Sequence, residues 1–584
     1  MSIEEVINFK FEKAFDKLGY DTKFATVKGS DRPDLSDFQC NGALALAKPL
    51  GKNPREIATN IVENLKFDED FEKISIDGPG FINVSLSSGF IAQNINTIAA
   101  DKKFGVNNNP SPLNVILDFG GPNVAKAMHV GHLRSGVIGE SVQRLMRFAG
   151  NNVTSDVHLG DWGTPMGMII AEIENEGIDA FALNVQEITN VYKKASAICK
   201  EDDKARENAR IVTAKLQDGD EKYRKIWQYI RDASVADVKE NYERLDVHFD
   251  LFLGESDVHE ICAEILEIAK SKGILEHDDG AYIIRLDEGN KPKPPVILQK
   301  SDGGYTYHTT DIATILMRVR DLKAQEIIYF TDARQNFHFE QVFEATEKLG
   351  IAPSVKLKHV GFGTVNGADG KPFKTRDGGV MNLSDLIDLS KDKVAESMPE
   401  PSEEYNKGYI DNLINQVAIA AIKFQDLKNN IASGYVFELD DFAKFEGKTG
   451  PYIQYAIARI NSILRKSAET GSNSISDNTT FVITNKEERD LALKIMQLNN
   501  AVNRAVNETE PSVLSDYTYN LAQSFSSFYN ASPIKDAESA EIAQSRLKIA
   551  KLTRDILVLM LDLLGIEAPE VMLKRGAPAT ANDI

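Results

Sequence analysis

The sequence has few cysteines, few tryptophans and no long apolar run. Its three cysteines lie far apart among 584 residues and form no Cys-x-x-Cys pair, which excludes a disulfide framework and a cysteine-rich zinc site. No segment approaches the roughly 20 consecutive apolar residues that a membrane-spanning helix needs. The N-terminus reads MSIEEVINFKFEKAF, which is acidic and patterned as a helix instead of a signal peptide. We therefore expect a soluble, cytoplasmic protein.

Basic residues are in the minority. The 67 lysines and arginines face 87 aspartates and glutamates, for a net charge of −20. This excess argues against nucleic-acid binding by the chain as a whole, because phosphate binding needs clustered basic side chains. Local patches decide such binding, however, so an RNA partner stays open. Hydrophobic residues at 42% exclude a mostly disordered chain, and the length suits three or four folding units.

The pattern of apolar residues divides the chain into three regions. Residues 1–108 combine helical spacing with two short strand patterns around a Gly-Pro-Gly turn, which predicts an α+β domain. Residues 109–388 alternate short apolar strands with helices, which predicts a Rossmann-like, doubly wound parallel sheet. A charged stretch near 175–290 is expected to form a helical insertion. Residues 389–584 carry amphipathic helical patterns and almost no strand signal, which predicts an all-α bundle.

The sharpest local feature is the run DFGGPNVAKAMHVGHLRS, which follows a predicted strand and opens a predicted helix. His129, Gly131 and His132 would lie at the helix N-terminus, where free N–H groups and the positive dipole end favour phosphate. Gly131 lets a base or sugar approach the backbone, and the two imidazoles can donate to phosphate oxygens during displacement. Zinc binding by the histidines is the rival interpretation. We predict no metal ligands.

The longer run PNVAKAMHVGHLRS, followed by HLGDWGTPMG, resembles the HIGH signature of the class I aminoacyl-tRNA synthetases, and the arginyl-tRNA synthetases in particular. YTYHTTDIA, FEGKTGPYIQYAIARI and LLGIEAPEVM extend the resemblance over nearly the whole chain. The resemblance implies an enzyme that activates L-arginine with ATP and Mg²⁺ and transfers it to tRNA specific for arginine. It also implies a monomer, and a need for tRNA during activation.

A guanidinium ligand carries five N–H donors and no acceptor, so its pocket needs carboxylates. Asp118 ends the predicted strand VILDF, at the edge where ligands bind in open α/β sheets. Tyr307 and Asp311 are four residues apart at a predicted helix start and share one face. We expect Asp118 and Asp311 to bind the guanidinium and Tyr307 to close over it. The resemblance adds Asn123 and Gln335 to this arginine pocket.

Two lysines are assigned to the phosphates of ATP by the resemblance. The class usually carries a KMSKS loop after a late strand, and here GKPFKTRDGG stands in that place. Lys374 is the expected substitute, and together with His129, Gly131 and His132 it completes the expected ATP site. Lys126, just before HVGH, is expected to compensate for the altered loop. A solvated loop charge is the simpler interpretation of Lys374.

The resemblance also assigns contacts with tRNA. The C-terminal bundle is expected to bind the anticodon, with Tyr455, Tyr529 and Met572 on that surface. The N-terminal domain is expected to reach the D-loop corner of the tRNA. Four basic side chains of the last predicted helix are spaced as one stripe, which we interpret as a phosphate track: Arg546, Lys548, Lys551 and Arg554.

Three alternatives remain open at this point. A synthetase-like RNA-binding protein without ligase activity would be signalled by loss of HVGH or Asp311, and both are present. A nucleotidyltransferase that adenylates a small acid would generally lack the large C-terminal bundle. A class I ligase of different amino-acid specificity is the nearest rival, and paired acidic residues count against a neutral substrate because an unpaired buried carboxylate is costly.

Overall fold

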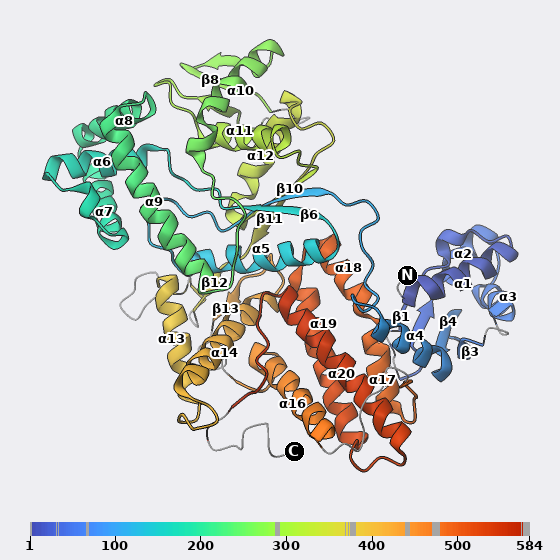
Figure 1. Ribbon diagram of the computed structural model, residues 1–584. Coiled ribbons are helices and arrows are strands. Elements are labelled where there is room, and N and C mark those ends of the chain that lie inside the picture. The colour runs from blue at the N-terminus through green and yellow to red at the C-terminus, as the bar shows by residue number, and fades with distance from the viewer. Residues whose placement is uncertain are drawn as a thin grey trace.

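The computed structural model describes residues 3–30, 32, 34–65, 69–286, 293–367, 370–371, 373, 381–437, 444–469, 479–573 and 575. It has an N-terminal α+β domain, a central parallel sheet with a large insertion, and a C-terminal helical bundle (Figure 1). This confirms the predicted fold class. Within the described ranges, every helix is too short or too polar to cross a membrane.

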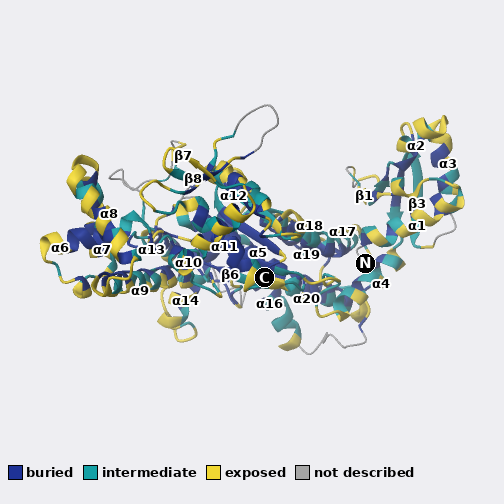
Figure 2. Cartoon of the chain, turned by 90° about the horizontal axis from the view of Figure 1, so that it is seen from above, coloured by how far each residue is buried: buried dark blue, intermediate teal, exposed yellow. Residues whose placement is uncertain are grey.

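The N-terminal domain packs helices on one antiparallel sheet. Its strands are β1 (Val27–Gly29), β2 (Phe38–Cys40), β3 (Phe71–Asp77) and β4 (Phe81–Leu86), in the order β1-β2-β4-β3. Its helices are α1 (Ile3–Lys17), α2 (Gly42–Leu50), α3 (Pro54–Leu65) and α4 (Ser88–Ala100). The domain stands out at one end of the molecule (Figure 2). The Arg489 guanidinium anchors it to the bundle by two bonds, of 2.8 and 2.6 Å, to the Asp37 carboxylate.

The central sheet is wholly parallel, in the order β11-β10-β5-β6. Its strands are β5 (Asn114–Asp118), β6 (Asn152–Asp156), β10 (Glu326–Asp332) and β11 (Lys356–Phe362). Its main covering helices are α5 (Gly131–Phe148), α11 (Tyr307–Arg320) and α12 (Asn336–Leu349). Both faces are buried: Val115 and Leu117 belong to the core on the α5 side, and Ile116 to the core with α11 and α12. β5 lies between β6 and β10 in the sheet. The strand order reverses beside β5, and in such sheets a crevice opens at the carboxyl ends of the two strands where the order reverses.

Between β6 and β10 the chain forms the insertion. It contains the helices α6 (Thr164–Glu176), α7 (Val185–Glu201), α8 (Asp203–Gln217), α9 (Glu221–Glu243) and α10 (His259–Ser271). An antiparallel sheet follows, in the order β7-β8-β9: β7 (Glu276–Asp278), β8 (Ala281–Ile284) and β9 (Val296–Gln299). The stretch near 175–290 is therefore not wholly helical, because β7 and β8 fall inside it. These strands are too short to leave an alternating pattern in the sequence.

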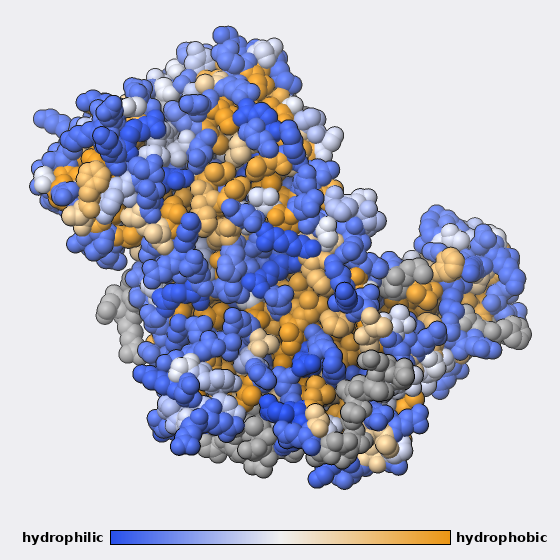
Figure 3. Space-filling model, in the orientation of Figure 1, coloured by the Kyte–Doolittle hydropathy of each residue, from blue (hydrophilic) through white to orange (hydrophobic). Residues whose placement is uncertain are grey.

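The C-terminal bundle packs against the back of α5. Its helices are α13 (Leu383–Ala395), α14 (Lys407–Leu427), α16 (Gly450–Glu469), α17 (Lys486–Met496), α18 (Leu498–Glu508), α19 (Pro511–Ala531) and α20 (Ala540–Leu563). One short strand, β13 (Tyr435–Val436), pairs in parallel with β12 (Val365–Asn366) of the central domain. The face shown in Figure 3 is mostly hydrophilic at its outer parts, and its hydrophobic residues gather toward the middle.

Close packing of α5 on the strand edge gives a testable prediction. A Cβ atom on Gly139 would lie 2.1 to 2.6 Å from ring carbons of Phe119. Alanine in a helix normally gains about 1 kcal/mol over glycine, but overpacking a core costs about 1–3 kcal/mol. Gly139→Ala should therefore lower the melting temperature. Gly89→Ala is the control, because Gly89 lies in α4 with no atom within 4 Å of the added carbon. A Gly139→Ala protein as stable as that control would contradict this packing.

Candidate active site

The loop after β5 is held tightly against the insertion. Gly120 has a φ of +73°, its N–H donates to Ser135 Oγ (2.7 Å), and its carbonyl accepts from the Tyr242 hydroxyl (2.9 Å). A Cβ on Gly121 would lie 2.3 Å from the His158 carbonyl oxygen. Only glycine permits this approach. The backbone that leads into the HVGH sequence is therefore fixed between β5 and α9.

The two histidines of HVGH lie side by side at the start of α5, with ring centroids 4.1 Å apart. The Gly131 N–H donates to His129 Nδ1 (3.0 Å), and the His129 N–H donates to His132 Nδ1 (3.1 Å). Because His129 Nδ1 accepts, we assign its ring proton to Nε2; His132 Nδ1 also lies 3.2 Å from the His129 carbonyl oxygen, so either nitrogen of that ring can carry the proton. Burial lowers the pKa of His129 and lowers that of His132 to about 3. At neutral pH both rings are neutral donors.

Lys126, one of the two lysines predicted to bind the phosphates, lies against the insertion. Lys126 is half-buried, and its ammonium lies over the Tyr192 ring of α7, 5.0 Å from the centroid. The preceding Ala125 has a φ of +65°, and its N–H donates to Ser234 Oγ on α9 (3.1 Å). The insertion thus contacts the loop at Ala125 and at the side chain of Lys126. Lys374 lies outside the described residues.

Asp118 has a partner that the sequence analysis missed. The guanidinium of Arg318, fully buried on α11, lies 2.7 Å from Asp118 Oδ2 and 2.7 Å from Asp156 Oδ2. Burial raises the pKa of Asp118, although Arg318 opposes the shift. Burial would also raise the pKa of Asp156, but His158 and Arg318 together hold it below its usual range. Asp118 is therefore neutralised from within the chain and is not a free anion.

The other predicted pocket residues lie at the same edge of the sheet. Tyr307 opens α11 and is 62% exposed; one turn later, Asp311 Oδ2 lies 2.5 Å from His338 Nε2. Gln335 is exposed just before α12, beyond the carboxyl end of β10. Asn123 is exposed, and its backbone pairs with that of Gly160. A Cβ on Gly160 would lie 2.3 Å from Asn123 Oδ1.

Glu255 is a further acidic residue at this edge, and the sequence analysis did not find it. It is only 9% exposed, and burial raises its pKa to about 7; the nearby charges of Asp161 and Asp311 act in the same direction, against His158. A Cβ on Gly163 would lie 4.0 Å from both Glu255 Oε2 and the Tyr307 hydroxyl. Glu255 and Tyr307 therefore border one space. A glutamate in a charged stretch gives no sequence signal of burial.

The predicted tRNA-contact residues occupy two helices of the bundle and the C-terminal segment. Tyr455 on α16 is half-buried and packs in the same cluster as Met572, which is buried. Tyr529 on α19 is half-buried, and the Arg459 guanidinium lies 4.5 Å from its ring centroid. Arg459 is one turn from Tyr455 on α16. Met572 therefore belongs to the buried core against which Tyr455 packs, and Arg459 lies against the ring of Tyr529.

The predicted phosphate track along α20 is wrong in its first half. Arg546 is buried, and its Nε donates to Glu488 Oε1 (2.7 Å). The Lys548 ammonium donates to Asn96 Oδ1 of α4 (2.8 Å), so it joins the bundle to the N-terminal domain. The other two basic residues of the stripe both pair with Asp555. Helical spacing identified one face correctly, but neighbouring helices cover part of that face.

The parallel sheet, with HVGH at the N-terminus of α5, defines a class I aminoacyl-tRNA synthetase. Residues 94–439 match the family described as tRNA synthetases class I (R), catalytic domain. Residues 453–572 match the DALR anticodon binding domain, and residues 1–86 match the arginyl tRNA synthetase N terminal domain.

Similar proteins narrow this class to one family. The chain is 43% identical to an arginine–tRNA ligase of Francisella tularensis, over 98% of this chain and 100% of the relative. It is also 43% identical to an arginine–tRNA ligase of Alkaliphilus oremlandii, over 96% and 98% of the two chains. The chain belongs to the arginyl-tRNA synthetase family.

Solved structures agree with this assignment. The arginyl-tRNA synthetase of Plasmodium falciparum superposes with a TM-score of 0.82 at 29% identity, covering 97% of this chain and 99% of that one. The Thermus thermophilus arginyl-tRNA synthetase superposes with a TM-score of 0.79, covering 98% and 100% of the two chains. At 23% identity this second similarity supports the fold alone.

The raised pKa of Glu255 predicts a cost in stability. Its pKa rises from 4.5 to about 7 on folding. Burial of Glu255 therefore costs no stability below pH 4.5, and the free energy of unfolding falls as the pH rises from 4.5 to 7. The loss above pH 7 is about 3 kcal/mol. Glu255→Gln should therefore raise the free energy of unfolding in urea at pH 8 and change it little at pH 4.5. The exposed Glu267→Gln, on α10, is the control, and an equal gain at both pH values would argue against this origin.

Proposed function

We propose that the chain is an arginine–tRNA ligase that works in two steps at the carboxyl edge of the parallel sheet. The arginine carboxylate attacks the α-phosphorus of ATP and displaces pyrophosphate, which forms arginyl-adenylate. The terminal ribose hydroxyl of the tRNA then takes the acyl group and AMP leaves. The observation that carries the proposal is that the loop leading into the two neutral histidines of HVGH packs, at Gly121, against His158, whose charge acts on the buried Glu255. Positioning and charge stabilisation dominate such chemistry.

The nucleotide is proposed to bind over the first turn of α5. His129 and His132 would donate ring N–H groups to phosphate oxygens as charge develops on the pentavalent phosphorus. Gly131 keeps the space between them open, because a Cβ there would lie 2.7 Å from His129 Cε1. Lys126 and Lys374 are proposed to act on the phosphates as cations. Mg²⁺ would enter on the phosphates of ATP and supply further positive charge.

The arginine side chain is proposed to extend between Glu255 and Asp311 and beneath Tyr307. Both carboxylates can accept from a guanidinium in planar, charge-assisted hydrogen bonds. Asp118 contributes to the pocket wall through its pair with Arg318, while Asn123 and Gln335 would bind the backbone end of the amino acid. A neutral substrate would leave the buried Glu255 carboxylate unpaired, which is costly.

The tRNA is proposed to span the molecule, with each domain taking one part of it. Residues 389–584 would bind the anticodon, where Tyr455 and Tyr529 offer ring faces for stacking and Met572 supports the first of them. Residues 1–108 would contact the D-loop corner, and residues 109–388 would hold the acceptor end. We further propose that the protein is a cytoplasmic monomer and that tRNA is needed for activation.

Arginine-dependent exchange of pyrophosphate into ATP tests the proposed function directly. Exchange is expected only when tRNA specific for arginine is present. Exchange without tRNA would keep the ligase but refute the tRNA requirement. If folded protein gave no exchange with arginine but did with another amino acid, the specificity would be wrong; binding of tRNA without any exchange would favour an RNA-binding protein.

The pocket assignment predicts a separation of kinetic effects. Glu255→Gln and Asp311→Asn should each raise the KM for arginine about 10- to 100-fold and leave the KM for ATP nearly unchanged, because each removes one charged partner of the guanidinium. His132→Ala should lower kcat with the arginine KM retained.

The same pocket predicts a pH dependence. In the wild type, kcat/KM for arginine should fall as pH drops below about 7, because protonation of Glu255 removes a negative charge from the free enzyme. The Glu255→Gln variant should lack this limb. Equal losses of arginine and ATP affinity in either acidic variant would count against the pocket.

A further inference from the structure

Arg134 lies one turn into α5, two residues beyond the second histidine of HVGH, and is 1% exposed. Its Nη1 donates to the carbonyls of Gly363 (2.9 Å) and Ser433 (2.8 Å). Its Nε lies 3.2 Å from Asp426 Oδ2, at the end of α14. One guanidinium therefore joins the signature helix, the end of β11 and two segments of the C-terminal bundle.

The two carbonyls that Arg134 binds belong to two segments of the backbone that are in direct contact. A Cβ on Gly363 would lie 2.4 Å from the Gly434 nitrogen, so only glycine fits. The Tyr435 N–H donates to the Thr364 carbonyl (3.1 Å) and the Phe437 N–H to the Asn366 carbonyl (2.8 Å), which forms the β12–β13 pair. The chain that leaves the catalytic sheet is thus bonded to the bundle immediately beyond the Arg134 contact.

The chain then turns back along β12. The Gly367 N–H donates to the Lys371 carbonyl (2.8 Å), and the Phe373 N–H donates to the Val365 carbonyl (3.1 Å). The Phe373 ring meets the Phe437 ring edge-on, with centroids 5.4 Å apart. Phe373 is therefore bound both to β12 and to the residue that follows β13.

The cluster around Arg134 combines an ion pair with an aromatic ring. Asp426 is fully buried, and the guanidinium lies 5.3 Å from the Tyr435 ring centroid. Burial raises the pKa of Asp426 while the Arg134 charge opposes the shift. A buried ion pair is weak evidence for stability, since apolar replacement is often neutral or stabilising. What this pair does supply is a fixed orientation of the guanidinium, whose Nη1 bonds the carbonyls of Gly363 and Ser433.

We propose that Arg134, oriented by Asp426, is a positioning residue for ATP. It holds the first turn of α5 against the chain that enters β12, and so fixes where the histidines of HVGH meet the triphosphate. The contact with Ser433 extends this link to the bundle. The proposal rests on the proposed function for its kinetic consequence, while its structural consequence can be measured without any activity.

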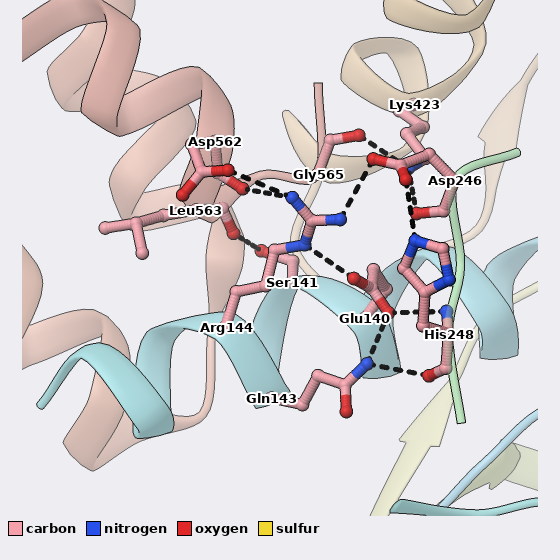
Figure 4. Close-up of polar contacts among 10 residues, drawn as sticks. All are labelled: Glu140, Ser141, Gln143, Arg144, Asp246, His248, Lys423, Asp562, Leu563 and Gly565. Atoms are coloured by element: carbon pink, nitrogen blue, oxygen red, sulfur yellow. Dashed lines mark hydrogen bonds and ion pairs between the residues drawn. The ribbon is translucent and has the colours of Figure 1, made fainter. Parts of the chain in front are cut away.

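The far end of α5 offers a matched control (Figure 4). There, the buried Glu140 accepts from Arg144 Nε (2.5 Å) and from the His248 N–H (2.9 Å). Lys423 of α14 donates to the carbonyls of Gly565 (2.5 Å) and Asp246 (2.9 Å) nearby. This second network also ties α5 to α14 and to the end of α20, but the bonds drawn in Figure 4 do not reach β12 or β13.

The kinetic test compares isosteric neutralisations of two buried carboxylates that pair with arginines. Asp426→Asn should raise the KM for ATP and lower kcat for activation, with a combined effect of about 10- to 100-fold. Arg134→Lys, which keeps the positive charge but loses the planar guanidinium, should have the same effect. The KM for arginine should stay within about threefold, because the arginine pocket is not touched. Glu140→Gln should leave both KM values within about twofold. Equal kinetic losses in Glu140→Gln would mean a general loss of stability and would overturn the proposal.

Amide hydrogen exchange supplies the second readout. Exchange at Tyr435 and Phe437 should speed up at least about tenfold in Arg134→Lys and Asp426→Asn, and should stay unchanged in Glu140→Gln. Unchanged protection of these amides, or faster exchange with an unaltered KM for ATP, would overturn the positioning role. Wild-type protein without arginine-dependent activity would refute the proposed function instead, and the exchange comparison would still decide whether Arg134 holds β12. Should Asp426→Asn fail to fold, Arg134→Lys, which keeps the buried charge, carries both measurements.

Discussion

The close packing of α5 between the parallel sheet and the C-terminal bundle is the constraint on which the other features depend. Small residues make this packing possible: a Cβ on Gly136 would lie 2.4 Å from the Tyr242 ring, and one on Gly139 would meet Phe119. The sheet, the insertion and the bundle therefore converge on one helix. Because the histidines of HVGH open that helix, its placement also fixes where these two side chains lie.

The buried carboxylates at the sheet edge are of two kinds, those paired with a cation of the chain and one that is not. Asp118 and Asp156 are compensated inside the chain by Arg318, whose charge they share. Among the described residues no lysine or arginine forms an ion pair with Glu255, and burial raises its pKa although His158 opposes the shift. In the proposed pocket a guanidinium ligand would supply the missing charge. The stability that this glutamate costs would then be the consequence of binding a cationic substrate.

Much of the architecture could be predicted because it depends on local patterns. Short apolar strands alternating with helices indicated the parallel sheet, and helical periodicity indicated the bundle. The candidate site was partly accessible for the same reason: HVGH lies on contiguous residues, and the four-residue spacing of Tyr307 and Asp311 places them on one face of α11. Asp118 and Gln335 follow strands, so the end of the sheet at which they lie also followed from the pattern.

By itself, the sequence determined the class of sheet, the helical bundle, the family and the position of HVGH at the start of a helix, since each is encoded by neighbouring residues. Only the tertiary structure decided which charges are buried and what compensates them. Arg546 belongs to a regular basic stripe but is enclosed by α17, while Glu255 sits in a charged stretch but is buried at the sheet edge. Arg134 finds its partners about 230 to 300 residues away. Charge is a property of one residue, but burial and pairing depend on elements that are remote in the chain, and it is desolvation that gives these charges their roles.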